Sequence, residues 1–147
     1  MVISLGSLSG LFAQNVNQLQ LAGDITSAEA TKVVQAAERL AKADNVLVNI
    51  AVVDAGGNLK AFLRMDGSFL GSIDVAIKKA KTARYFNCAT GDLGKITQPG
   101  GPIYQIEYTN GGLVSFPGGV PIKDENGVII GAVGISGGTI DQDHQLA

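Results

Sequence analysis

The sequence of 147 residues contains little of what catalytic and metal sites are usually built from: it has one cysteine, one histidine and no tryptophan. A single cysteine, Cys88, cannot form an internal disulfide, and it leaves no Cys-x-x-Cys pair for zinc or redox chemistry. A single histidine, His144, cannot supply a histidine-rich metal site, and it argues against a Ser-His-Asp triad elsewhere in the chain. We therefore expect no metal centre.

Charge is also scarce. The chain has 11 basic and 13 acidic residues and a formal net charge of -2. A nearly neutral, slightly acidic protein is a poor match for nucleic acid or for an anionic membrane surface. Charged residues make up 16% of the chain, against about 25% in an average soluble domain. We infer that another subunit covers part of an apolar surface, and we expect a homo-oligomer.

No apolar run reaches the length of about 20 residues that a membrane-spanning helix needs. Residues Met1–Gln14 have no basic segment and no clear cleavage site, so we identify no signal peptide. With the lack of a disulfide, this leads us to expect a cytoplasmic protein, although it leaves open a leader already removed. We divide the chain into an N-terminal arm, 1–22, and a single domain, 23–147. The arm reaches a neighbouring subunit or is a mobile terminus, and both remain open.

The first half of the domain carries clear local signals. Thr26 and Glu29 form a capping box and predict a helix that ends near Asp44. Residues 46–53 and 59–65 read as two strands joined by a Gly-Gly turn, which predicts a hairpin. A second helix follows Asp66, with an apolar stripe at helical spacing.

Residues 87–112 are irregular, with a short helix predicted at Thr90 and one turn of helix within 103–109. Three strands then follow, at Leu113–Phe116, Val120–Lys123 and Val128–Ser136, the last two joined by an Asn-Gly turn. A second capping box, at Thr139, predicts a final helix. The order favours an α+β fold with a single, mostly antiparallel, five-stranded sheet and helices packed on its faces.

Three charged residues are candidates for ligand contact. Asp54 opens the first hairpin turn, and a turn-forming role competes with a binding role there. Arg64 lies at a strand end, where a local ion pair or a helix cap explains most of its environment. Lys79 belongs to a group of cations in the second half of the second helix, which suit the helix dipole but cannot all face open water.

Two glycine-rich loops supply the other candidates. Gln98, Gly100, Gly101 and Tyr104 lie in a Pro-Gly segment that is neither helix interior nor central strand. Phe116, Gly118 and Gly119 form a bend that could bring backbone amides up to a flat ligand. We expect these glycine-dense bends to leave a recess for a ligand. The residues identify no nucleophile or base.

Seven segments together resemble a known family. In chain order they are Val53–Leu59, Arg64–Gly67, Ser72–Ala76, Lys79–Ala83, Gln98–Tyr104, Phe116–Pro121 and Gly131–Thr139. The chain resembles the GlcG/HbpS family, also called PduO C-terminal-like domains, over about residues 25–147. The resemblance implies a profilin-like fold that assembles into dimers or larger rings, often octamers. It also implies haem binding in some members, and the family is sometimes described as haem-degrading. The axial histidine of the adenosyltransferase-linked members has no counterpart here.

Three hypotheses follow. In the first, the chain is an oligomeric accessory protein that binds a small molecule, with haem or a related tetrapyrrole as the leading ligand. In the second, it is an enzyme that acts on a small oxygenated metabolite at the Gln98–Tyr104 loop, which places Lys79, Asp54, Arg64 or Tyr104 in the reaction. In the third, it is an assembly subunit with no ligand.

Overall fold

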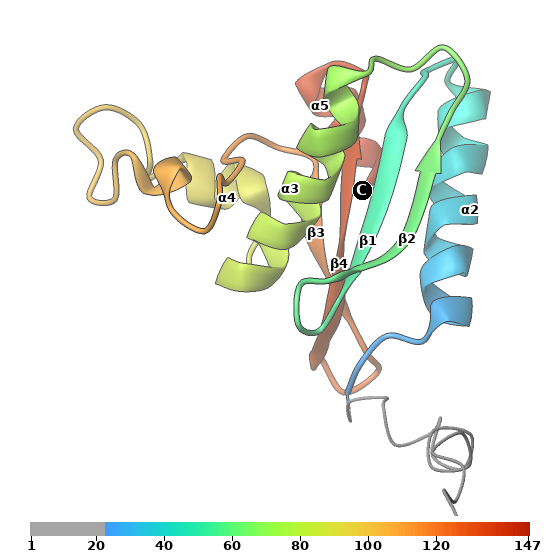
Figure 1. Cartoon of the computed structure of the whole chain (residues 1–147), viewed down its shortest axis with the longest axis horizontal. Helices are drawn as coiled ribbons and strands as arrows, with labels where there is room; N and C mark the ends of the chain where they lie inside the picture. The colour runs from blue at the N-terminus through green and yellow to red at the C-terminus, as the bar shows by residue number, and fades with distance from the viewer. Residues whose placement is uncertain (1–22) are drawn as a thin grey trace, which may run out of the picture.

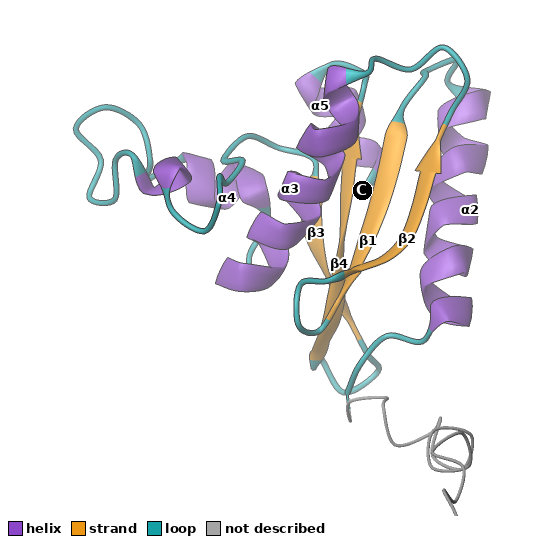
Figure 2. Cartoon of the chain, in the orientation of Figure 1, coloured by secondary structure: helices purple, strands orange, loops and turns teal. Residues whose placement is uncertain are grey.

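The computed structural model describes residues 23–147, and the proposed arm, 1–22, lies outside the described residues. The elements are α2 (Ser27–Ala43), β1 (Asn49–Asp54), β2 (Leu59–Arg64), α3 (Gly71–Phe86), α4 (Thr90–Gly94), the 3-10 turn η2 (Ile106–Tyr108), β3 (Gly119–Lys123), β4 (Ile129–Ser136) and α5 (Ile140–Leu146). Figure 2 shows the helices grouped around one sheet. No helix among residues 23–147 has the length and apolar character to span a bilayer.

The sheet has four strands in the order β2-β1-β4-β3, and every neighbouring pair is antiparallel. The prediction of an α+β fold with one antiparallel sheet is therefore confirmed, while the prediction of a fifth strand is wrong. Residues 113–116 bond elsewhere. The Val114 amide donates to the Thr82 hydroxyl at 3.0 Å, and the Leu113 amide donates to the Glu107 carbonyl at 2.9 Å. Because these two amides are already bonded to α3 and to the preceding turn, residues 113–116 do not pair with the sheet.

The helices form a layer on each side of the sheet (Figure 1). Helix α2 packs on β1 and β2, and its buried residues join Ile50, Val52 and Ile135 in the larger core. Helix α3 packs on β4, β1 and β3 through a thinner layer of alanine and valine. The close approach of α3 depends on Gly134, because a Cβ there would overlap the Ala76 carbonyl oxygen. Branched side chains thus fill the space between α2 and the sheet, and small side chains fill the space between α3 and the sheet.

Local capping signals set the helix starts. Thr26 accepts from the Glu29 amide, and the Glu29 carboxylate accepts from the Thr26 amide at 2.8 Å, which confirms the predicted capping box. Thr139 and Gln142 form the same arrangement at the start of α5. Both capping boxes are confirmed. They can be predicted from the sequence because their hydrogen bonds span only three residues and need no tertiary contact.

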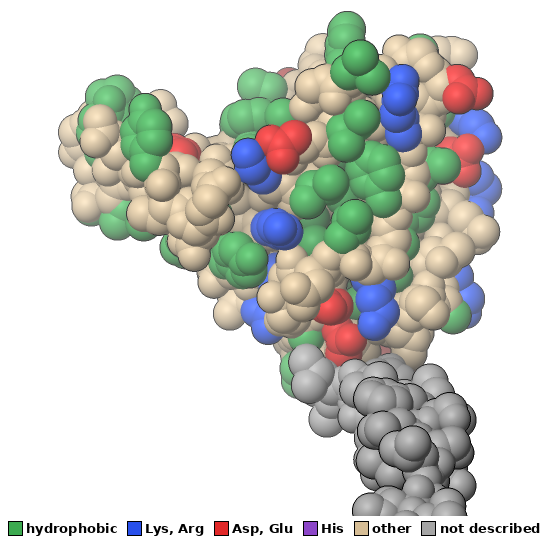
Figure 3. Space-filling model, viewed as in Figure 1, with side chains coloured by type: hydrophobic (Ala, Val, Ile, Leu, Met, Phe, Trp, Pro, Cys, Tyr) green, Lys and Arg blue, Asp and Glu red, His purple; other side chains and the backbone are tan. Residues whose placement is uncertain are grey.

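The segment between α4 and β3 extends away from the sheet (Figure 1), and it stands out from the body in the space-filling view (Figure 3). It contains η2 and follows α4, as the sequence predicted, and otherwise consists of turns. Its base is fixed to the rest of the fold, because a Cβ at Gly94 would overlap the Ser115 carbonyl oxygen. We call residues 95–112 the projecting segment.

Candidate functional site

Lys79 occupies the inner face of α3 and is completely buried. Its Nζ donates to the Asp143 carboxylate (Oδ2) at 2.8 Å and to the Ile135 backbone carbonyl at 2.8 Å. The Phe116 ring covers the same ammonium, with its centroid 4.8 Å from Nζ. A buried cation needs such partners, because an isolated charge in the protein interior is very costly.

Asp143 completes this centre from α5, in a sequence position that gave no signal. Oδ1 accepts from the Gly138 amide at 2.9 Å, while Oδ2 accepts from Lys79. The residue is 4% exposed, although the next residue, His144, is exposed to solvent. Sequence analysis missed Asp143 because an acidic residue near the start of a helix is usually explained by the helix dipole.

The Phe116–Gly119 bend closes over the pair. Gly118 has a φ of +117°, and a Cβ there would lie 2.6 Å from the Lys79 Nζ. The Gly119 amide donates to the Thr90 hydroxyl at 3.0 Å, and the Ile135 amide donates to the Gly118 carbonyl at 2.8 Å. Gly118 and Gly119 themselves leave no recess, because the absence of a Cβ lets them pack closely on Lys79 and Thr90.

Burial lowers the pKa of Lys79 below its ordinary value of 10.5, and the hydrogen bond and charge of Asp143 partly offset that effect. A lysine with a lowered pKa can act as a nucleophile when a substrate reaches it. Here the amine is covered by Phe116 and Gly118, and its bonds are made to the protein itself. The arrangement acts as a clamp that joins α3, β4 and α5.

A hollow of about 250 Å³ adjoins the bend, lined by Ala89, Gly91, Asp92, Lys95, Pro117 and His144. The Lys95 Nζ donates to Asp92 at 2.7 Å, and this hydrogen bond holds the pKa of Asp92 below its usual range. The His144 imidazole is exposed here. The hollow is thus small, and an ion pair occupies part of its wall.

The other predicted site residues lie in separate places. Asp54 acts within its own turn, where Oδ1 accepts from the Gly56 amide at 2.9 Å and from the Asn58 amide at 2.8 Å. Arg64 ends β2 and lines a different hollow, of about 430 Å³, together with Glu38 and Lys42 from α2. Neither residue lies in the clamp.

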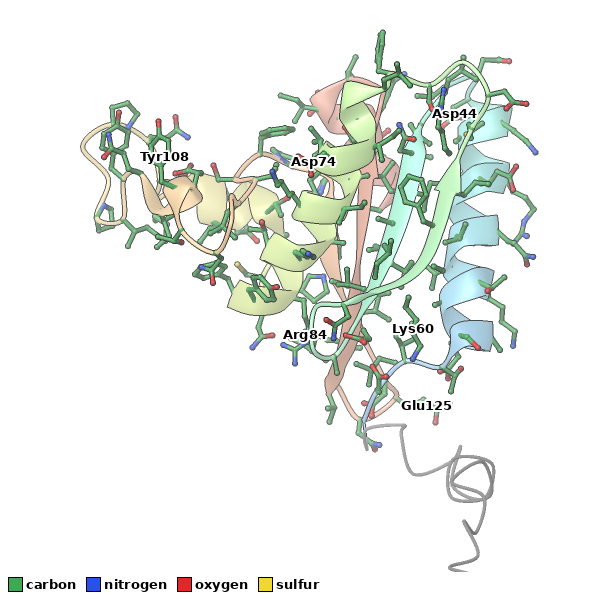
Figure 4. All side chains as sticks on the ribbon, viewed as in Figure 1. Asp44, Lys60, Asp74, Arg84, Tyr108 and Glu125 are labelled. Carbon is green, nitrogen blue, oxygen red and sulfur yellow. The ribbon has the colours of Figure 1, made fainter. Side chains whose placement is uncertain are left out.

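The Pro-Gly residues belong to the projecting segment. The Gln98 side-chain amide donates to the Gly94 carbonyl at 2.9 Å, and Gly101 packs against the Ile96 carbonyl. Gly100 has open space around its Cα, and Tyr104 is half exposed. Figure 4 labels Tyr108 on the same segment, where its side chain is 84% exposed. The structure therefore gathers Lys79, Phe116, Gly118 and Gly119, and it distributes the other six candidates over three places.

Comparison with known proteins is consistent with this fold. The family model described as "Haem degrading protein HbpS-like" matches residues 25–147. The chain belongs to the HbpS-like family. An uncharacterised 15.0 kDa protein from the dhaT-dhaS intergenic region of Citrobacter freundii is 43% identical over 133 residues, which cover 90% of this chain and 93% of that protein.

Two solved structures extend the comparison for this HbpS-like chain. Protein ORFY of Klebsiella pneumoniae has a TM-score of 0.82 at 39% identity, over 90% of this chain and 91% of that one. A structure described as the PduOC:heme complex has a TM-score of 0.80 at 34% identity, over 84% of this chain and 90% of that one. The relatives thus include a protein solved with haem.

Proposed function

We propose that the chain is a cytoplasmic, oligomeric accessory protein that binds a small molecule, and that this molecule is haem or a related tetrapyrrole. The observation that carries the proposal is the similarity to the PduOC:heme complex, at 34% identity over 84% of this chain. Family membership across residues 25–147 supports the same ligand class. A tetrapyrrole offers a flat apolar ring and carboxylates, so its site needs apolar side chains and cations.

The described residues fit the ring and the carboxylates better than they fit the iron. Large apolar side chains are exposed on several elements, and Arg64 at the end of β2 is an exposed cation. The exposed imidazole of His144 lies instead in the small hollow, beside the Asp92–Lys95 ion pair. Bound haem would bring its own iron chemistry.

The clamp removes Lys79 from the four residues named for an enzymatic role. The hypothesis of an enzyme requires a residue such as Lys79 to reach a substrate. Lys79 is completely buried and bonded to Asp143 and Ile135. A side chain in this position stabilises the fold, while exposed apolar surface is left for a ligand and for other subunits.

A titration with hemin tests the proposal. We expect a saturable change of the Soret band with one hemin per chain and a Kd on the order of 1 μM. Co-elution of hemin with the protein in size-exclusion chromatography should follow the same stoichiometry. A Soret signal that rises linearly, as for hemin added to buffer, would contradict tetrapyrrole binding. Light scattering on the same column tests assembly, and a strict monomer would contradict the oligomeric part.

A further inference from the structure

One half of the sheet lacks a helix on the α3 side. Helix α3 packs on β4, β1 and β3, whereas the extensive helix contacts of β2 are made with α2, on the opposite face. Figure 1 shows β2 lying beside α3 and not beneath it. The α3-facing side of β2 is therefore open in the described chain.

The register of β2 decides which side chains occupy this open side. Phe62 pairs with Ala51, and both belong to the layer beneath α3. Because side chains alternate along a strand, Arg64 lies on the same face as Phe62, and at the end of β2 it also borders the hollow that Glu38 and Lys42 line. Ala61 and Leu63 point the other way and pack in the larger core. The open side of β2 thus presents an aromatic ring and, two residues on, the cation of Arg64.

Helix α3 supplies the facing wall. Ile73, Ile77, Lys81 and Tyr85 follow one another at intervals of four residues and share one side of the helix. Ile77 packs with the same layer as Phe62, and the Tyr85 ring lies over Gly57 in the β1–β2 turn. These contacts orient this side of α3 toward β2. We call the surface formed by Phe62, Arg64, Ile73, Ile77 and Lys81 the open face.

The open face combines an apolar centre with a basic edge. Figure 3 shows hydrophobic side chains gathered between α3 and β2, with Lys and Arg side chains around them. Lys60, labelled in Figure 4, lies at the register shift between β1 and β2 and is paired with Asp24 at 3.2 Å, so we do not count it in the open face. Within residues 23–147, neither Arg64 nor Lys81 has a carboxylate within 4.0 Å. Two cations thus remain available on opposite walls of an apolar patch.

We propose that the open face binds the tetrapyrrole through its ring and its carboxylates, independently of a metal in the ring. This inference rests on the proposed function. Phe62 and Ile77 contact the ring, and Arg64 and Lys81 each pair with a carboxylate, because Arg and Lys form charge-assisted bonds with such groups. The five residues of the open face include no imidazole, thiol or thioether to bind iron. A second copy docked symmetrically here would bring like cations together, which disfavours self-association through this surface.

The test compares three ligands: hemin, iron-free protoporphyrin IX, and protoporphyrin IX dimethyl ester, which lacks both charges. Binding is followed by absorbance and by porphyrin fluorescence. The double variant R64Q/K81Q removes the basic edge, and K32Q/R39Q removes the same charges from exposed positions on α2. The variant H144A removes the imidazole. Circular dichroism confirms that each variant is folded.

We expect wild type to bind hemin and protoporphyrin IX with Kd values within about threefold, and R64Q/K81Q to weaken both by about tenfold. The dimethyl ester should bind at least about tenfold more weakly than the free acid, and K32Q/R39Q and H144A should change Kd by less than about twofold.

Two results would overturn the inference and leave the proposed function standing. One is hemin binding that R64Q/K81Q leaves unchanged, and the other is hemin binding that H144A abolishes. If the wild type binds neither hemin nor protoporphyrin IX, both the inference and the proposed function are overturned.

Discussion

The Lys79 ammonium and the Asp143 carboxylate lie 2.8 Å apart in the protein interior, although the two residues are 64 positions apart in the chain. Lys79 belongs to α3 and Asp143 to α5, and the Phe116–Gly119 bend packs over both. The pair therefore joins three segments that meet only in the folded chain. Its main role is to hold α5 and the bend in place.

Replacing Lys79 by methionine should strongly destabilise the protein. The variant K79M keeps most of the side-chain volume but leaves Asp143 buried without its cation. Removing one partner of a buried ion pair typically lowers the free energy of unfolding by about 3–5 kcal/mol. Urea unfolding followed by circular dichroism measures this loss, and a loss below about 1 kcal/mol would contradict the assignment.

The double variant K79M/D143L separates the pair from simple packing. Because it removes both charges, it should be more stable than K79M alone. If the double variant is as unstable as the sum of the two single variants, the residues act independently and the clamp is not a pair.

The contribution of Lys79 to stability should depend on pH. Burial lowers the pKa of Lys79 in the folded protein below its ordinary value of 10.5, so the unfolded chain binds the extra proton more readily. Between the two pKa values the free energy of unfolding therefore rises with pH. The difference in that free energy between wild type and K79M should grow as the pH rises toward the ordinary lysine pKa of 10.5. A difference that shrinks as the pH rises would mean that folding raises the pKa of Lys79, which contradicts the prediction.

Gly118 should not tolerate alanine. Its φ of +117° is unfavourable for other residues, and the new Cβ would lie 2.6 Å from the Lys79 Nζ and 3.0 Å from the Asp143 Cβ. We expect G118A to lower the free energy of unfolding by about 1–3 kcal/mol. The matched control is G71A, because a Cβ added at Gly71 would have no atom within 4 Å and the residue begins a helix. If G118A and G71A change the free energy of unfolding equally, Gly118 is not closely packed against Lys79 and Asp143.

Thr26 should contribute to stability through its cap. Its hydroxyl accepts from the Glu29 amide, and its amide donates to the Glu29 carboxylate. Thr26→Ala should lower the free energy of unfolding by about 1 kcal/mol, while Thr26→Ser should retain most of it. Thermal unfolding of the two variants side by side provides the measurement, and identical midpoints would show that the cap contributes nothing.

Local patterns predicted most of the regular structure. The capping boxes at Thr26 and Thr139 and the two hairpins depend on residues a few positions apart, and all four are found in the structure. The apolar side chains of Leu113–Phe116 predict a strand. The conformation of this segment depends instead on the Thr82 hydroxyl, 32 positions away, which a local pattern does not contain.

The candidate site shows the same limit. The sequence predicts a bend near a ligand at Phe116, Gly118 and Gly119, and the structure packs this bend on Lys79. Whether a loop leaves a recess or closes on the core depends on the side chain that reaches it, here a buried lysine with its partner Asp143. Of the open face, the sequence singles out Arg64 alone. Phe62 and Ile77 read as ordinary core positions, and only the placement of α3 leaves β2 uncovered.

A crystal structure of the protein grown with hemin tests the central claim most directly. We expect the porphyrin between α3 and β2, with its ring against Phe62 and its carboxylates within ion-pair distance of Arg64 and Lys81. A porphyrin bound in the His144 hollow or on the projecting segment would contradict the account.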